Sequence, residues 1–234
     1  MIPIDLYLRV REKEGRLYSD QIVARLPDIP ADHPLVDEWR ARAESANRLA
    51  HYVARLPQPP CILELGCGNG WLSHKLASIS GVRVWGLDRG GSELAQAWRL
   101  FHASNLTFLN ADIFRSPFAL HSFDLIVLAS VIQYFPDLAA LIRALQDLLL
   151  PGGEIHVLDS PLYNENELAS ARERTRAYYA SLGFPEMAGS YFHHIVSSLH
   201  PFSPRWLYRP RNWQTRFRRR LGRIMPPFAW FCIR

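Results

Sequence analysis

The sequence has few cysteines and no long apolar run, and both shortages exclude classes of protein. Its 234 residues include three cysteines, Cys61, Cys67 and Cys232, which have neither the even number of a disulfide framework nor the close spacing of a metal site. No apolar run approaches the roughly 18 residues of a transmembrane helix, and the first residues lack the apolar segment of a signal peptide. We therefore expect a cytoplasmic protein with no disulfide framework, bound metal or membrane span.

Acidic residues are missing from the end of the chain. Residues 201–234 contain nine arginines and no aspartate or glutamate, whereas the other 200 residues contain 18 basic and 22 acidic side chains. Such asymmetry indicates an anionic partner, for example RNA, a membrane surface or a phosphorylated substrate. The pattern also fits a basic helix, over residues 212–224, that covers a sheet edge and exposes its charged face to solvent. The sequence leaves both interpretations open.

A glycine-rich turn follows the apolar run at residues 61–65. The glycines stand at alternate positions: Gly66, Gly68 and Gly70. An apolar strand, a glycine turn and a helix in this order are typical of a site where the backbone closely approaches a nucleotide-like ligand. A dinucleotide fingerprint would place its third glycine at position 71, which is Trp71. Glu64 precedes the turn, and a carboxylate there suits a cationic ligand group better than a phosphate.

An acidic residue follows the second predicted strand, residues 82–87. Asp88 lies 22 residues after Gly66, close to the spacing of about 20 residues expected for a carboxylate that binds ribose hydroxyls. Further strands are predicted at residues 106–109, 123–128 and 154–158, with helical segments between them. This alternation predicts an α/β fold with a parallel sheet.

These landmarks together resemble the class I S-adenosylmethionine (SAM) dependent methyltransferases, in particular the type 11 group. The E-x-G-x-G-x-G turn, Asp88, the segment 129–137 after the fourth strand and the turn at 151–153 occur in the family's order over residues 60–160. The resemblance implies a Rossmann-like, doubly wound, seven-stranded sheet. It would be mostly parallel, with an antiparallel C-terminal hairpin formed by residues 204–208 and 227–233.

The resemblance also implies which residues bind SAM. They are Glu64, Gly66, Cys67, Gly68, Asn69, Gly70, Asp88, Arg89, Asp112, Ile113 and Ala129. Asp112 would contact the adenine amino group. Arg89 stands where the family usually has an apolar residue, and its guanidinium could stack on the adenine ring. Cys67 is interpreted as a small loop residue, with a nucleophile as the alternative.

The family has no universal catalytic residue, because methyl transfer from a sulfonium mainly requires alignment of the two reactants and exclusion of water. An oxygen or nitrogen nucleophile can also need a general base, and the candidates are His193, His194 and Tyr134. The expected function is methyl transfer to such a nucleophile on a small molecule, with an anionic or sugar-like acceptor among the alternatives. An RNA methyltransferase and a non-catalytic SAM-binding protein are the other two hypotheses. The oligomeric state and the acceptor stay undetermined.

One methyltransferase domain is expected to comprise the whole chain. Residues 1–57 would form a helical cap and residues 58–160 the SAM-binding core. Residues 161–200 would form a lid or substrate-recognition insertion, and residues 201–234 the basic C-terminal hairpin and helix. Ligands of such sheets bind beyond the carboxyl ends of the strands, which is where a cap and a lid can contact them.

Overall fold

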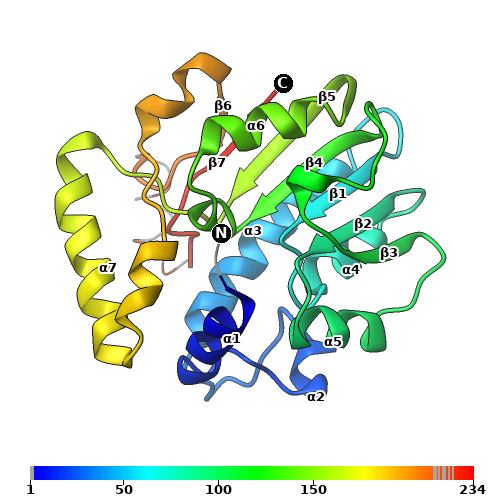
Figure 1. Cartoon of the computed structure of the whole chain (residues 1–234). Helices are drawn as coiled ribbons and strands as arrows, with labels where there is room; N and C mark the ends of the chain where they lie inside the picture. Colours follow the sequence, from blue (N-terminus) through cyan, green and yellow to red (C-terminus); the bar gives the residue numbers. More distant parts are fainter. Residues whose placement is uncertain (1–2, 213–214, 216, 218–219, 221, 223) are drawn as a thin grey trace.

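A seven-stranded mixed sheet forms the centre of the molecule (Figure 1). The computed structural model describes residues 3–212, 215, 217, 220, 222 and 224–234, and the strand order is β3-β2-β1-β4-β5-β7-β6. The first five strands pair in parallel, and β7 pairs antiparallel with both β5 and β6. The strands are β1 (Cys61–Leu65), β2 (Arg83–Asp88), β3 (Leu106–Asn110), β4 (Phe123–Ala129), β5 (Leu149–Leu158), β6 (Arg205–Tyr208) and β7 (Trp230–Ile233).

Helices cover both faces of this sheet. One face packs against α3 (Val36–Val53), α4 (Trp71–Ala77) and α5 (Ser92–Leu100) through a buried cluster that includes Leu49 and Leu76. The other face packs mainly against α6 (Leu138–Gln146). Because β1 and β4 are buried on both faces, their sequences are mostly apolar and do not alternate between apolar and polar residues; each contains one acid, Glu64 or Asp124.

Two helices lie beyond the carboxyl ends of the parallel strands. In Figure 1, α1 (Ile4–Lys13) and α7 (Leu168–Leu182) stand at the end toward which the arrows of β4 and β5 point. A small apolar cluster joins them, built around Val10 of α1, Tyr179 of α7 and Met187 of the 3₁₀ segment η4 (Pro185–Ser190). The short α2 (Asp20–Val23) connects α1 to α3, and the 3₁₀ segments η1 (Ile113–Arg115), η2 (Ile132–Tyr134), η3 (Glu165–Glu167) and η5 (Val196–Phe202) complete the fold.

The predicted fold class and sheet are confirmed, including the antiparallel C-terminal strands. One boundary differs: the turn predicted at residues 151–153 lies inside β5, where the pairing with β4 shifts register. Gly152 has φ +84° there and no atom near its missing Cβ, so the irregularity bulges outward. The predicted helix at residues 212–224 lies largely outside the described residues.

A polar network around the buried Glu154 connects the antiparallel strands to the parallel ones. Glu154 of β5 accepts hydrogen bonds from Tyr52, His156, Arg205 and Arg234. His156 is fully buried, donates from Nε2 to Glu154 at 3.1 Å and accepts from the Trp230 indole at Nδ1 at 3.1 Å. The imidazole is therefore neutral with a fixed tautomer, and burial lowers its pKa.

Within the part of the chain that is described, no helix combines the length and the apolar character that crossing a bilayer requires.

Candidate functional site

The glycine turn after β1 leaves space for a ligand at one position and packs tightly at the others. Gly66 has φ +77°, and a Cβ there would stand 2.4 Å from Val131 Cγ2. Gly70 has φ +76°, and a Cβ there would stand 2.6 Å from the Phe108 ring, so its role in this structure is close packing between α4 and the sheet. Gly68 has φ +51°, and the atom nearest to a Cβ added there would be Glu93 Oε1, at 3.9 Å. The turn is thus open to a ligand at Gly68.

Asp88 holds this turn at the tip of the neighbouring strand. Its Oδ2 accepts a hydrogen bond from the Gly68 N–H at 2.8 Å, and its Oδ1 accepts one from the Arg89 N–H at 2.7 Å. Burial raises the pKa of this carboxyl to about 6, although the two N–H donors favour the charged form. Each carboxylate oxygen has a second lone pair, so the group can accept two further hydrogen bonds from a ligand.

Glu64 lies beneath the turn and is 3% exposed. Its carboxyl accepts a hydrogen bond from the Ser73 hydroxyl, and burial raises its pKa to about 8. At neutral pH this side chain is mostly uncharged, which does not favour the cation-binding role expected for it. Burial also raises the pKa of the Cys67 thiol well above its ordinary value. The thiol therefore stays protonated, and the geometry favours a small loop residue over a nucleophile.

Helix α1 packs across the open side of the turn. The missing Cβ of Gly91, in the loop after β2, would lie 3.2 Å from Leu8 Cδ1, so only a glycine permits this approach without displacement. Arg11 Nη2 lies 3.5 Å from Glu93 Oε1, the same oxygen that stands beside Gly68. Arg11 Nε is buried and has no hydrogen-bond partner among the described residues. The helix thus brings an unsatisfied cationic donor close to the glycine turn.

A cavity of about 800 Å³ lies between the strand tips, α1, α3 and α7. Of the predicted site residues, it is lined by Glu64, Gly66, Cys67, Gly68, Asn69, Ala129 and Tyr134. Those that do not line it are Gly70, Asp88, Arg89, Asp112, Ile113, His193 and His194. The structure therefore brings the turn, the tip of β4 and Tyr134 into one space.

The predicted adenine contacts lie next to Asp88, outside this cavity. Asp112 caps the N-terminus of the η1 segment and accepts a hydrogen bond from the Phe114 N–H at 3.0 Å. Ile113 is 4% exposed and packs in the apolar core beneath. Asp112 keeps acceptor capacity for a ligand amino group, whereas the Ile113 side chain is committed to the core.

The two histidine candidates have structural partners. His193 Nε2 lies 2.8 Å from the Thr175 hydroxyl of α7, and His194 Nε2 donates to the Ile132 carbonyl at 2.9 Å. Burial lowers the pKa of both imidazoles. These contacts tie the segment after η4 to α7 and η2. The geometry thus gives the histidines a positioning role, and Tyr134 alone of the three candidates faces the cavity.

Several cavity residues were not anticipated from the sequence. Asp159 directly follows β5, lines the cavity and adopts a left-handed conformation with φ +53°. Ser130 follows β4 with φ +57°, and its hydroxyl donates to the Asp159 carbonyl at 2.9 Å. Both stand at carboxyl ends of strands. Asp159 could therefore have been predicted from its position after a strand, as Asp88 was. Tyr7 and Arg11 had no comparable signal, because their position depends on the path of α1.

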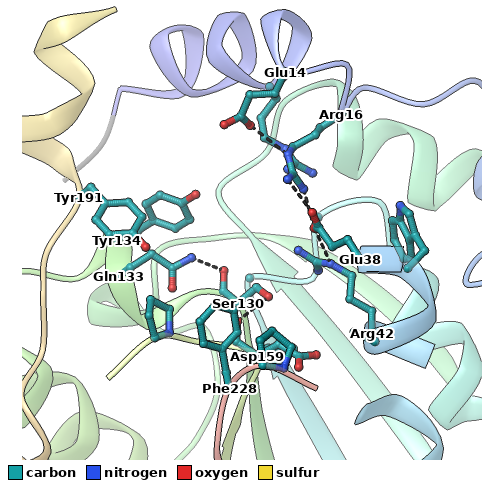
Figure 2. A pocket seen from close by; sticks show the side chains of 18 of the residues that line it. Glu14, Arg16, Glu38, Arg42, Ser130, Gln133, Tyr134, Asp159, Tyr191 and Phe228 are labelled. Carbon is teal, nitrogen blue, oxygen red and sulfur yellow. Dashed lines mark hydrogen bonds and ion pairs between the residues drawn. The ribbon is translucent and has the colours of Figure 1, made fainter. Parts of the chain in front are cut away.

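The cavity has two chemically different walls (Figure 2). Figure 2 shows Tyr134 and Tyr191 on one side and the ion-paired side chains of Arg16, Glu38 and Arg42 on the other. Arg16 binds Glu38 with both terminal nitrogens at 2.6 Å, and Arg42 Nε binds the same carboxylate at 3.0 Å. This cavity can therefore contact an aromatic or apolar group on one side and hydrogen-bonding groups on the other.

Comparison with known proteins agrees with the geometry. Residues 62–153 match the family described as a methyltransferase domain. The chain is 31% identical over 140 residues to the biotin biosynthesis bifunctional protein BioCD of Bordetella avium, covering 59% of this chain and 30% of that protein. It is 36% identical over 107 residues to the 2-phytyl-1,4-naphtoquinone methyltransferase of Thermosynechococcus vestitus, covering 44% of this chain and 48% of the other.

A solved structure shows the same fold. A putative methyltransferase from Bacillus halodurans C-125 superposes with a TM-score of 0.55 at 15% identity, covering 70% of this chain and 71% of that one. The present chain spans less than half the length of the two curated relatives named above. The matched methyltransferase domain, the strand order and the glycine turn with its neighbouring acid together make this chain similar to the class I SAM-dependent methyltransferases.

Proposed function

We propose that this protein transfers a methyl group from SAM to a nitrogen or oxygen nucleophile of a small molecule. The observation that carries the proposal is the opening above Gly68, flanked by the Asp88 carboxylate and by the wide cavity. A ligand that crosses this turn meets a ribose-binding acid on one side. On the other side it meets a space large enough for a second reactant.

The residues present fit the groups of SAM. Asp88 can accept hydrogen bonds from two ribose hydroxyls, and Asp112 can accept one from the adenine amino group. Arg11 offers its unsatisfied Nε–H to the carboxylate of the methionyl part. When bound, SAM supplies a methyl carbon activated by a positively charged sulfur. The chain's contribution is to hold this group, align the acceptor and exclude water with α1 and α7.

Ion pairs within the chain occupy several arginines near the C-terminus, and this favours a small acceptor over RNA. Arg205 and Arg234 both bind Glu154, at 3.2 and 3.0 Å, and Arg211 binds Glu167 at 2.9 Å. Several of the nine arginines therefore neutralise acids of the same chain. The quinone methyltransferase among the relatives, by its name, acts on a small molecule, and this supports the same class of acceptor here.

Calorimetric titration with S-adenosylhomocysteine, the product of methyl transfer, tests the proposal. We expect binding, and at about 100 times the dissociation constant a stabilisation of about 2.7 kcal/mol, seen as a higher melting temperature. NADH is the control, because a dinucleotide-binding turn would respond to it. A response to NADH without a response to S-adenosylhomocysteine would refute the proposal. Incorporation of labelled methyl from SAM into metabolite extracts then tests transfer itself.

A further inference from the structure

Two hydrogen-bond acceptors in the cavity lack a full set of donors. Gln133 of η2 is 7% exposed and lines the cavity; its Nε2 donates to the Ser130 carbonyl at 2.7 Å. Its Oε1 is buried without a hydrogen-bond partner in the described part of the chain. An unsatisfied buried acceptor is costly, and a ligand that brings an N–H or O–H donor removes the cost.

Asp159 is the second acceptor. It follows β5, one strand beyond Ser130 in the sheet order, and therefore stands farther from the glycine turn than the tip of β4 does. Its Oδ1 accepts from the Ser45 hydroxyl of α3 at 2.6 Å, and burial raises the pKa of this carboxyl. The strained left-handed backbone at this position is a feature that concentrates at functional sites.

Arg42, whose charge acts on Asp159, is already bound to another acid. Arg16 and Arg42 both hold Glu38, at 2.6 and 3.0 Å. Arg174, which also lines the cavity, lies exposed on α7 and hydrogen-bonds Ser170 at 3.2 Å. An acceptor molecule with a carboxylate or phosphate would therefore have to break the Glu38 pairs to gain Arg16 or Arg42 as a partner. This arrangement disfavours an anionic group beside Asp159.

Tyrosine rings form the opposite wall. Tyr134 contacts Tyr7 with ring centroids 5.6 Å apart and Tyr191 at 6.2 Å, both edge to face, and Tyr191 contacts Tyr179 at 6.1 Å. All four line the cavity. The faces of such rings attract cations, and the Asp159 carboxylate in the same cavity adds direct charge complementarity.

We propose that the methyl acceptor is an amine, held between Asp159, the Gln133 Oε1 and the tyrosine wall, and that Asp159 removes its proton. This inference rests on the proposed methyltransferase function. The alkylammonium gives one proton to the Asp159 carboxylate and becomes a neutral amine with a free lone pair. Its nitrogen forms a bond to the methyl carbon as the carbon–sulfur bond breaks and the electron pair stays on sulfur. The methylated nitrogen leaves as an ammonium, and the protonated carboxyl releases its proton to water.

Three phenols that differ in one group test this assignment: tyramine (ammonium), tyrosol (hydroxyl) and 4-hydroxyphenylacetate (carboxylate). Each is titrated calorimetrically into protein saturated with S-adenosylhomocysteine. We expect tyramine to bind at least about tenfold more tightly than the other two. Asp159→Asn should reduce tyramine affinity by about tenfold or more, with unchanged affinity for S-adenosylhomocysteine. Asp37→Asn is the matched control, because Asp37 lines the same cavity but pairs with Arg40 at 3.1 Å and is largely exposed.

Tyrosol binding as tightly as tyramine would overturn the amine assignment in favour of a hydroxyl acceptor. Tighter binding of 4-hydroxyphenylacetate, or no binding of tyramine, would overturn it as well. Unchanged tyramine affinity in Asp159→Asn would remove the role of this carboxylate. If that variant does not fold, Gln133→Leu replaces it, and loss of tyramine affinity is again the expected result. Failure of S-adenosylhomocysteine itself to bind would instead refute the proposed function.

Discussion

The raised pKa of Asp88 makes the affinity for S-adenosylhomocysteine depend on pH. Burial raises this pKa to about 6, and two backbone N–H groups already hold the carboxylate in place. Ribose hydroxyls donate to the charged form, so binding lowers the pKa further. By linkage, the affinity is fully present above the pKa of the free protein and is lost as the pH falls through it.

The size of the change in affinity follows from the fraction of Asp88 that is ionised at each pH. At about pH 7.5 nearly all Asp88 is charged, whereas at about pH 5, one unit below its pKa, about one tenth is charged. The affinity should therefore fall by about tenfold, or about 1.4 kcal/mol, between these two conditions. Isothermal titration calorimetry measures the change, and circular dichroism at both pH values verifies that the fold is intact.

Asp88→Asn is the control for this experiment. The variant should bind about 1–3 kcal/mol more weakly at neutral pH because it loses charge-assisted bonds, and its affinity should vary little with pH. An equal affinity of the unmodified protein at both pH values would refute the assignment of Asp88 to the ribose. A pH dependence that persists in Asp88→Asn would place the titrating group elsewhere, with Glu64, whose pKa burial raises to about 8, as the candidate.

Three further predictions concern the turn and the C-terminal strands. Gly66→Ala places a Cβ against Val131 at a left-handed position and should destabilise the fold by about 3 kcal/mol. Gly152→Ala, with φ +84° but open space around it, should cost about 1–2 kcal/mol. Equal denaturation midpoints for the two variants would contradict this prediction. Burial lowers the pKa of His156 below the ordinary value of about 6.5, so the unfolded chain binds a proton at a higher pH than the folded protein does. The melting temperature should therefore fall as the pH drops below about 6.5. In a His156→Gln variant this part of the decline should be absent, and an unaltered decline would assign it to other groups. One possible metal-ligand atom from each of Glu154, His156 and Cys232 lies within 4.8 Å of the other two, as a metal site would require. The Glu154 carboxylate, however, is already bound by the guanidiniums of Arg205 and Arg234. A chelator should therefore leave the melting temperature unchanged, and stoichiometric zinc in the purified protein would contradict this interpretation.

The core of the fold could be predicted from the sequence because its signals are local. The apolar run at residues 61–65 and the glycines after it specify a strand and a turn by their own backbone requirements. Asp88 was predicted for the same reason, since it ends the next strand along the chain. The boundary missed in β5 shows the limit of such signals: a Pro-Gly-Gly segment is typical of a turn, yet pairing with β4 extends the strand through it.

The charges and the cavity walls depended on contacts between distant segments. Glu64 was expected to be an anion, but the tertiary structure buries it beside Ser73 and raises its pKa to about 8. The His193–His194 pair suggested a general base by composition alone, and packing against α7 and η2 gives both rings structural partners. No periodicity in the sequence specifies such an environment.

The sequence by itself therefore determined the order of strands and helices, the glycine turn and the acid at the end of β2. These features arise from residues close to one another in the chain. Only the tertiary structure decided that Arg11 would lie against Glu93, 82 residues away, and that Ser45 would hold Asp159, 114 residues away. Such contacts depend on the way α1 and α3 cross the carboxyl ends of the strands. Side-chain packing over the whole chain selects that path, and no local stretch of sequence encodes it.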